Sequence, residues 1–206
     1  MDYTQHPKLE FRRKFFKVFG AEIAVTDAIT QQQVGYIKMK AFKLKEDVRL
    51  YADASMQTEL MTIKARSVID FGATYDVVDT MSGDPVCSLR RHGLRSTFVR
   101  DKWDVLDASG TVIGQVLETS GWLAIARRYV GAIHEVLAFA FMMVAETYTV
   151  TSIRGGVTTP TASIVHRKNP FVVKMDLEVT ATPEGSDPRV NVAVTAMLSV
   201  IDASKG

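Results

Sequence analysis

Six basic side chains recur at equivalent positions in three successive segments of the chain. When the sequence is aligned on Asp27, Asp53 and Asp79, one basic residue follows each aspartate by eleven positions and another follows two positions later. The six are Lys38, Lys40, Lys64, Arg66, Arg90 and His92. Cations in such an array suit anionic lipid headgroups or other polyanions, because each contributes on the order of 1 kcal/mol near a charged membrane.

Strand geometry predicts which way these side chains point. Residues two apart in a strand share a face, so the six basic residues are expected on one face of a sheet. Strict alternation places Val34, Leu60 and Val86 on that same face and sends Ile37, Ile63 and Leu89 into the core. The alternative is a solvated face whose Lys and Arg side chains only discourage edge pairing.

No other pattern has the spacing of a catalytic or metal-binding motif. The four histidines, His6, His92, His134 and His166, are far apart, and the sequence contains neither CxxC nor HExxH. It also lacks GxSxG, GxGxxG and a P-loop. We therefore expect no enzyme activity, no metal site and no cofactor. The single cysteine, Cys87, lies in an alternating apolar segment and is predicted to be a buried, inert thiol.

The elements that position the basic residues are predicted to be hairpins. Asp27, Asp53, Asp79 and Asp107 each end a short apolar run, and they are spaced 26, 26 and 28 residues apart. A polar turn follows each aspartate, which can cap that turn with its own carboxylate. The second, alternating runs cover 34–40, 60–66, 86–92 and 112–118. Four tandem hairpins predict an antiparallel meander, which usually curls or closes because exposed edges invite aggregation.

The following segment is predicted to be a helical insertion, about 119–147. It contains the apolar run 136–145, whose ten residues fall short of the ~20 that cross a bilayer. We therefore expect this run to be a buried helix or strand. Strands are expected to resume over 148–153, 161–166 and 171–180, within a region about 148–182.

The C-terminal segment is predicted to be a helix surrounded by the sheet, about 188–203. Asp187 suits the N-cap and Pro188 the first helical position. The residues from Val190 onward are apolar almost all round, and a helix of that kind must be covered by protein when it is too short to span a membrane. A strand is the competing interpretation, because 190–195 also alternates.

Repeated Asp-turn hairpins followed by a capped apolar helix resemble the tubby C-terminal-like superfamily, which includes the LURP-one-related proteins and phospholipid scramblases. The closest motifs run from Val78-Asp79 through Leu89-Arg90-Arg91 and from Trp103 through Gly114, and the resemblance covers about residues 15–118 together with the C-terminal helix. It implies a mainly β (α+β) domain spanning 1–206, an antiparallel closed β-barrel around the C-terminal hydrophobic helix. Tubby domains engage phosphoinositides through basic strand residues, but no position could be matched one by one. Scramblase activity is not carried over, because the sequence lacks an acidic Ca²⁺ loop and a cysteine cluster of palmitoylation type.

Charge and terminal sequence limit the partners that we expect. The formal net charge is +2 and the N-terminal residues form no apolar signal-type run. We therefore expect a cytoplasmic protein, in contact with an anionic membrane only peripherally, and no nucleic-acid partner. The oligomeric state is left open.

The sequence is compatible with three functions. The first is a non-catalytic module that binds anionic headgroups or other polyanions on the basic face. The second is a protein-interaction domain or homo-oligomer that docks through 119–147. The third is a barrel that encloses a small apolar ligand, which competes with a helix for the lumen.

Overall fold

The computed structural model describes residues 3–14, 20–40, 47–66, 73–92, 102–119, 145–167 and 174–203. A short 3₁₀ turn, η1, covers Tyr3–Gln5, and one α-helix, α3, covers Arg189–Ala203. The strands are β1 (Lys8–Lys14), β2 (Gly20–Asp27), β3 (Gln33–Lys40), β4 (Asp47–Tyr51), β5 (Glu59–Ala65), β6 (Thr74–Asp79), β7 (Pro85–Arg91), β8 (Lys102–Leu106), β9 (Val112–Glu118), β10 (Glu146–Arg154), β11 (Val157–Arg167) and β12 (Lys174–Val179).

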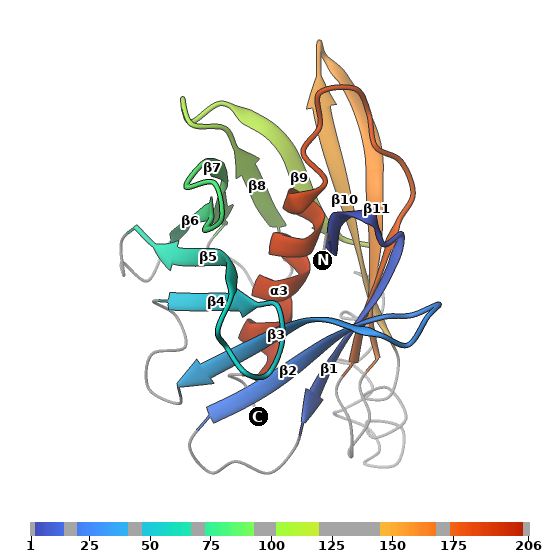
Figure 1. Ribbon diagram of the computed structural model, residues 1–206. Coiled ribbons are helices and arrows are strands. Elements are labelled where there is room, and N and C mark those ends of the chain that lie inside the picture. Colours follow the sequence, from blue (N-terminus) through green and yellow to red (C-terminus); the bar gives the residue numbers. More distant parts are fainter. Residues whose placement is uncertain are drawn as a thin grey trace, which may run out of the picture.

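The strands form a closed antiparallel barrel (Figure 1). Each strand pairs with the next in the sequence, and β1 pairs with β12 to close the ring. In this closing pair Leu9 faces Leu177 and Phe11 faces Met175, and all four side chains are buried. The mainly β, closed-barrel fold class is therefore confirmed, and closure removes the edges that a long meander would expose.

Helix α3 lies inside the barrel and fills its lumen (Figure 1). Every residue from 191 to 200 is buried. The helix begins as predicted, because Asp187 Oδ1 accepts a hydrogen bond from the Arg189 amide at 2.9 Å, the geometry of an N-cap. The competing strand interpretation is wrong, since a segment buried on all sides satisfies its backbone internally only as a helix. Between the helix and the strands β7 to β9 the described residues leave a cavity of about 10 Å³, which is too small for an enclosed apolar ligand.

The four recurring aspartates cap hairpin turns, as predicted. Asp27 Oδ1 accepts from the amides of Ile29 and Thr30 at 2.6 and 2.7 Å. Equivalent bonds join Asp53 to Ser55 at 2.8 Å, Asp79 to Met81 and Ser82 at 2.8 and 3.1 Å, and Asp107 to Ser109 and Thr111 at 2.8 and 2.9 Å. Hydrogen bonds lower the pKa of all four carboxyls, and burial opposes them at each. At Asp79 burial is the largest single influence, and the bond from Arg189 lowers the pKa more than the turn amides do. The regular spacing of the four aspartates in the sequence is therefore the spacing of hairpin turns, each capped by its own aspartate.

A β-bulge follows the turn in five hairpins. The pairing register shifts between β2 and β3, β4 and β5, β6 and β7, β8 and β9, and β10 and β11. The unpaired extra residues are Val34, Leu60, Val86, Ile113 and Thr161. Val34 and Leu60 belong to the buried core, so their predicted place on the basic face is wrong. The extra residue breaks strict alternation and turns these side chains inward.

Several strand assignments differ from expectation; among them, β11 begins at Val157 and not at the predicted residue 161. Strand β1 was not predicted, although Leu9 and Phe11 alternate with charged residues. Strand β10 begins at Glu146, so the last residues assigned to the helical insertion are strand. Residues 120–144, which hold nearly all of that insertion, lie outside the described residues, as does most of the apolar run 136–145. Among the helices of the described ranges, none has the length and apolar character needed to cross a membrane.

Candidate functional site

The basic face lies on the outside of the barrel, over β3, β5 and β7. Lys38, Lys64 and Arg66 are exposed, Arg90 is half-buried and His92 is exposed. The neighbouring Ile37, Ile63 and Leu89 are fully buried in the core, as the alternation predicted. Lys40 ends β3, and its side chain lies outside the described part of the structure. We call Lys38, Lys40, Lys64, Arg66, Arg90 and His92 the outer basic face.

Three of these residues bind carboxylates on neighbouring strands. Arg66 makes two hydrogen bonds to Asp76, at 2.5 and 3.0 Å. Arg90 Nη2 and His92 Nε2 both approach Asp104 Oδ2, at 2.8 and 2.7 Å. Hydrogen bonding from Arg66 lowers the pKa of Asp76. Burial alone would raise the pKa of Asp104, but the bonds from Arg90 and His92 outweigh it and lower that pKa. The charges of Arg66, Arg90 and His92 are therefore partly neutralised by carboxylates of the barrel itself.

Lys38 and Lys64 are not neutralised by carboxylates among the described residues. Lys64 lies in register with Asp47 and Asp76, but Arg49 binds Asp47 at 2.8 Å and Arg66 binds Asp76. Neither lysine forms an ion pair with any other residue in the described ranges. Among the members of the outer basic face whose side chains are described, these two ammonium groups can therefore bind an external anion without breaking an internal ion pair.

The cysteine and the described histidines outside the outer basic face are buried or paired with acidic residues of the barrel. Burial raises the pKa of the Cys87 thiol to about 12, so this side chain stays protonated at neutral pH, in agreement with its predicted inertness. His6 pairs with Asp27, and buried His166 lies 3.4 Å from Glu146 and 3.2 Å from Asp202. His134 lies outside the described residues. Within the described part of the chain, no three His, Cys, Asp or Glu side chains are grouped to hold a metal ion.

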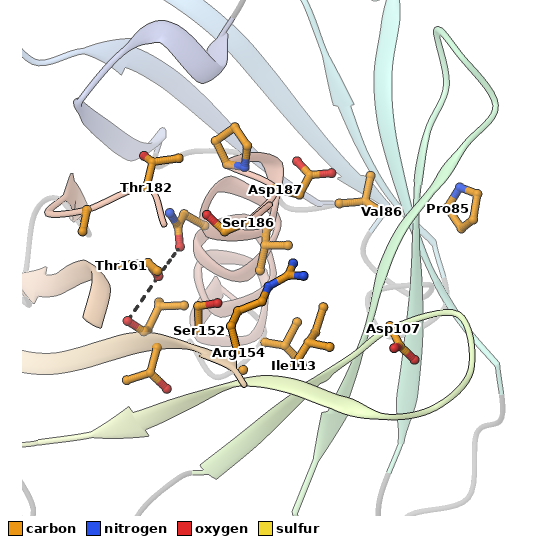
Figure 2. A pocket seen from close by; sticks show the side chains of 18 of the residues that line it. Pro85, Val86, Asp107, Ile113, Ser152, Arg154, Thr161, Thr182, Ser186 and Asp187 are labelled. Atoms are coloured by element: carbon orange, nitrogen blue, oxygen red, sulfur yellow. Dashed lines mark hydrogen bonds between the residues drawn. The ribbon is translucent and has the colours of Figure 1, made fainter. Parts of the chain in front are cut away.

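A pocket that the sequence did not predict lies at the mouth of the barrel (Figure 2). It has a volume of about 270 Å³ and lies between the hairpins β8–β9 and β10–β11, the segment 181–188 and the first turn of α3. We call it the mouth pocket. Its apolar lining includes Val86, Val105, Ile113, Val150 and Val190.

Polar groups from β10, β11 and α3 form one side of the mouth pocket, and Asp107 and Asp187 add two acids to its lining. Thr161, the bulge residue of the fifth hairpin, donates to the Asn191 side-chain oxygen at 3.1 Å and lies 3.3 Å from the Val150 carbonyl (Figure 2). Ser152 is buried beside them, and Arg154 reaches the Gly185 carbonyl. The one sequence signal for this site is Asn191, a buried amide near the start of a mostly apolar helix.

Ion pairs between Arg189, Asp187 and Asp79 hold the start of the helix beside the mouth pocket; we call these three residues the Arg189 clasp. Arg189 binds the Asp187 carboxylate through Nε and Nη2, at 3.0 and 2.7 Å. Its Nη1 binds Asp79 Oδ2 at 2.6 Å, which joins the helix to the turn between β6 and β7. The N-terminus of the helix is therefore already supplied with negative charge by Asp187 and is not an open anion site.

A closed barrel of antiparallel hairpins wrapped on a hydrophobic C-terminal helix defines the tubby-like class of domains. The model of the LURP-one-related family matches residues 33–199, and the chain belongs to this family. Comparisons with curated proteins and with solved structures give no match. Barrels of this class are generally non-catalytic, and membership indicates a tubby-like binding domain.

Proposed function

We propose that this domain is a non-catalytic module that binds an anionic headgroup, or another polyanion, on its outer basic face. The observation that carries the proposal is the pair Lys38 and Lys64, which are exposed on the same outer surface and form no ion pair with other described residues. Arg49 and Arg66 support them by occupying Asp47 and Asp76, the carboxylates that could otherwise bind Lys64.

The charge balance of this surface sets the expected strength of binding. Arg49, Arg66, Arg90 and His92 are matched by carboxylates, so the surface lacks a broad positive field. Two uncommitted lysines contribute about 2 kcal/mol at about 1 kcal/mol each, a factor of roughly 30 in affinity. We therefore expect weak, salt-sensitive binding that depends on local contact with phosphate groups.

Vesicle co-sedimentation tests the proposal. The protein is mixed with vesicles of phosphatidylcholine alone, or with added phosphatidylserine or a phosphoinositide, at about 50 mM and about 300 mM salt. Binding is expected only to the anionic vesicles and is expected to fall at the higher salt concentration. The double variant Lys38→Glu/Lys64→Glu should abolish it.

The control variant is Arg12→Glu/Arg167→Glu, which makes the same change in net charge on β1 and β11. This control should keep most of the binding, because those residues lie away from the outer basic face. If both double variants lost vesicle binding equally, net charge and not the outer basic face would account for the binding. Unchanged binding by Lys38→Glu/Lys64→Glu would refute the proposal.

A further inference from the structure

The mouth pocket contains polar groups that the barrel itself does not use. Ser152 is only 9% exposed, and no group in the described part of the chain hydrogen-bonds its hydroxyl. Asn191 is 5% exposed, and its side-chain oxygen is bound by Thr161 while its amide nitrogen has no partner among the described residues. Neither atom is among the fully enclosed unpaired atoms of the described residues, so both keep accessible surface at the pocket, where water or a ligand can complete their hydrogen bonds.

Arg154 adds a cation to the same pocket. Arg154 is one of the side chains that line the pocket (Figure 2). Its Nη2 donates to the Gly185 carbonyl, and no carboxylate among the described residues pairs with it. The two acids that line the pocket are occupied elsewhere. Asp187 is bound by Arg189, and Asp107 accepts bonds from its own turn. The guanidinium of Arg154 therefore keeps donors for a further acceptor.

The rest of the pocket lining is apolar, and this limits which ligands can bind. Val86, Val105, Ile113, Val150 and Val190 line the pocket with aliphatic surface. The cavity has a volume of about 270 Å³. This space and its lining suit a short apolar chain with one polar end.

From this arrangement we infer that the mouth pocket binds a small carboxylate with a short apolar tail. The carboxylate is held by Arg154, Ser152 and the Asn191 amide nitrogen, and the tail lies against the valine and isoleucine side chains. A carboxylate satisfies this site because Arg and an amide N–H are both donors, and a charged acceptor strengthens each bond. The site is separate from the outer basic face.

A titration with three probes that share one tail tests the inference. The full chain, labelled with ¹⁵N, is titrated with hexanoate, 1-hexanol and hexylamine while amide chemical shifts are followed. Hexanoate is expected to give saturable shifts at Gly114, Ser152 and Asn191. Hexanol should bind at least about tenfold more weakly, since it lacks the charged acceptor, and hexylamine should give no saturable shift.

Variants locate the effect in the pocket. Arg154→Gln keeps hydrogen-bonding capacity at an exposed position but removes the charge, and it should reduce hexanoate binding to the level of hexanol. Arg167→Gln, on the same hairpin but outside the pocket, should bind like the wild type. Lys38→Glu/Lys64→Glu should also bind hexanoate normally, so the result is independent of the proposed function.

Three outcomes would overturn the inference. They are the absence of saturable shifts with hexanoate, equal affinity for hexanoate and hexanol, and unchanged hexanoate affinity in Arg154→Gln. The urea unfolding midpoint of each variant shows whether it is folded. The comparison of the three probes on the wild-type chain is decisive even if a variant fails to fold.

Discussion

Asp104 links the predicted binding surface to the stability of the barrel. Its side chain is 5% exposed, yet it carries a charge, because Arg90 and His92 both bind Oδ2 from the outer surface. Gln115 adds a longer contact to Oδ1 at 3.4 Å. An unpaired buried carboxylate would be costly, so these two basic residues offset the desolvation of Asp104. The same side chains that look like an anion site in the sequence therefore serve an internal anion.

Replacing Asp104 by Asn tests this role through its pH dependence. The variant should lower the free energy of unfolding by about 1.5–3 kcal/mol at pH 7, because two charge-assisted hydrogen bonds weaken. The folded-state pKa of Asp104 is lowered, so its contribution is complete above the ordinary value of 3.8 and is lost as pH falls through the folded-state pKa. Urea unfolding at pH 7 and near pH 3 should show a smaller difference from the wild type at the lower pH. A difference that is equal at both pH values would contradict the assignment.

At the scale of elements, the repeating unit is a hairpin with a capped turn and a bulge. The bulge residue follows the capping aspartate by seven positions in the first three hairpins, as Asp27–Val34 shows, and by six between Asp107 and Ile113. The residue after the bulge points inward, and in two hairpins it is a glycine, Gly35 or Gly114. Position 114 requires glycine because the backbone of β10 approaches closely, and a Cβ there would lie 2.4 Å from the Thr151 carbonyl oxygen.

The two glycines give a comparison at equivalent positions. Gly114→Ala should lower the free energy of unfolding by about 1–3 kcal/mol, because a backbone carbonyl in the ladder cannot move aside without breaking strand pairing. Gly35→Ala should cost less, since its Cβ would first meet the Leu50 side-chain methyl at 3.0 Å, and a side chain can adjust. Urea denaturation of both variants measures the difference. An equal loss in both variants would show that backbone approach at Gly114 is not decisive.

At the scale of the whole molecule, α3 serves as the core on which the strands close. The helix contacts β1, β4, β7, β11 and β12 from inside. The Arg189 clasp to Asp79 and the Asp187 cap fix its first turn at the mouth of the barrel. Without the helix the inner faces of the strands would surround an unfilled lumen, and close packing could not be maintained.

Met197 tests how much stability the filled lumen provides. Met197→Ala should lower the free energy of unfolding by about 2–5 kcal/mol, because this side chain is 1% exposed and its loss leaves a cavity. Met81→Ala is the matched control, since Met81 is 70% exposed in a turn and should change stability by less than about 0.5 kcal/mol. Urea unfolding checks both variants. Similar small effects would mean that the barrel does not depend on packing against α3.

The sequence determined the features that depend on neighbours along the chain. The turn aspartates bond amides two to four residues away, the alternation around Ile37 and Lys38 separates core from surface, and Asp187 with Pro188 starts the helix. Each of these patterns depends on a short stretch of chain, so spacing and residue type were enough to predict it. The closed barrel itself was predicted through the family resemblance.

Tertiary structure alone decided the features that depend on residues far apart in the sequence. Closure pairs β1 with β12, and the bulges that turn Val34 and Leu60 inward follow from how paired strands fit. The partners of Arg66 and Arg90 come from adjacent strands, so the sequence showed six cations but not which were neutralised. The mouth pocket brings together Arg154, Thr161 and Asn191 only when the helix enters the barrel. Charge pairing and cavity shape depend on distances in space, which a local sequence pattern does not specify.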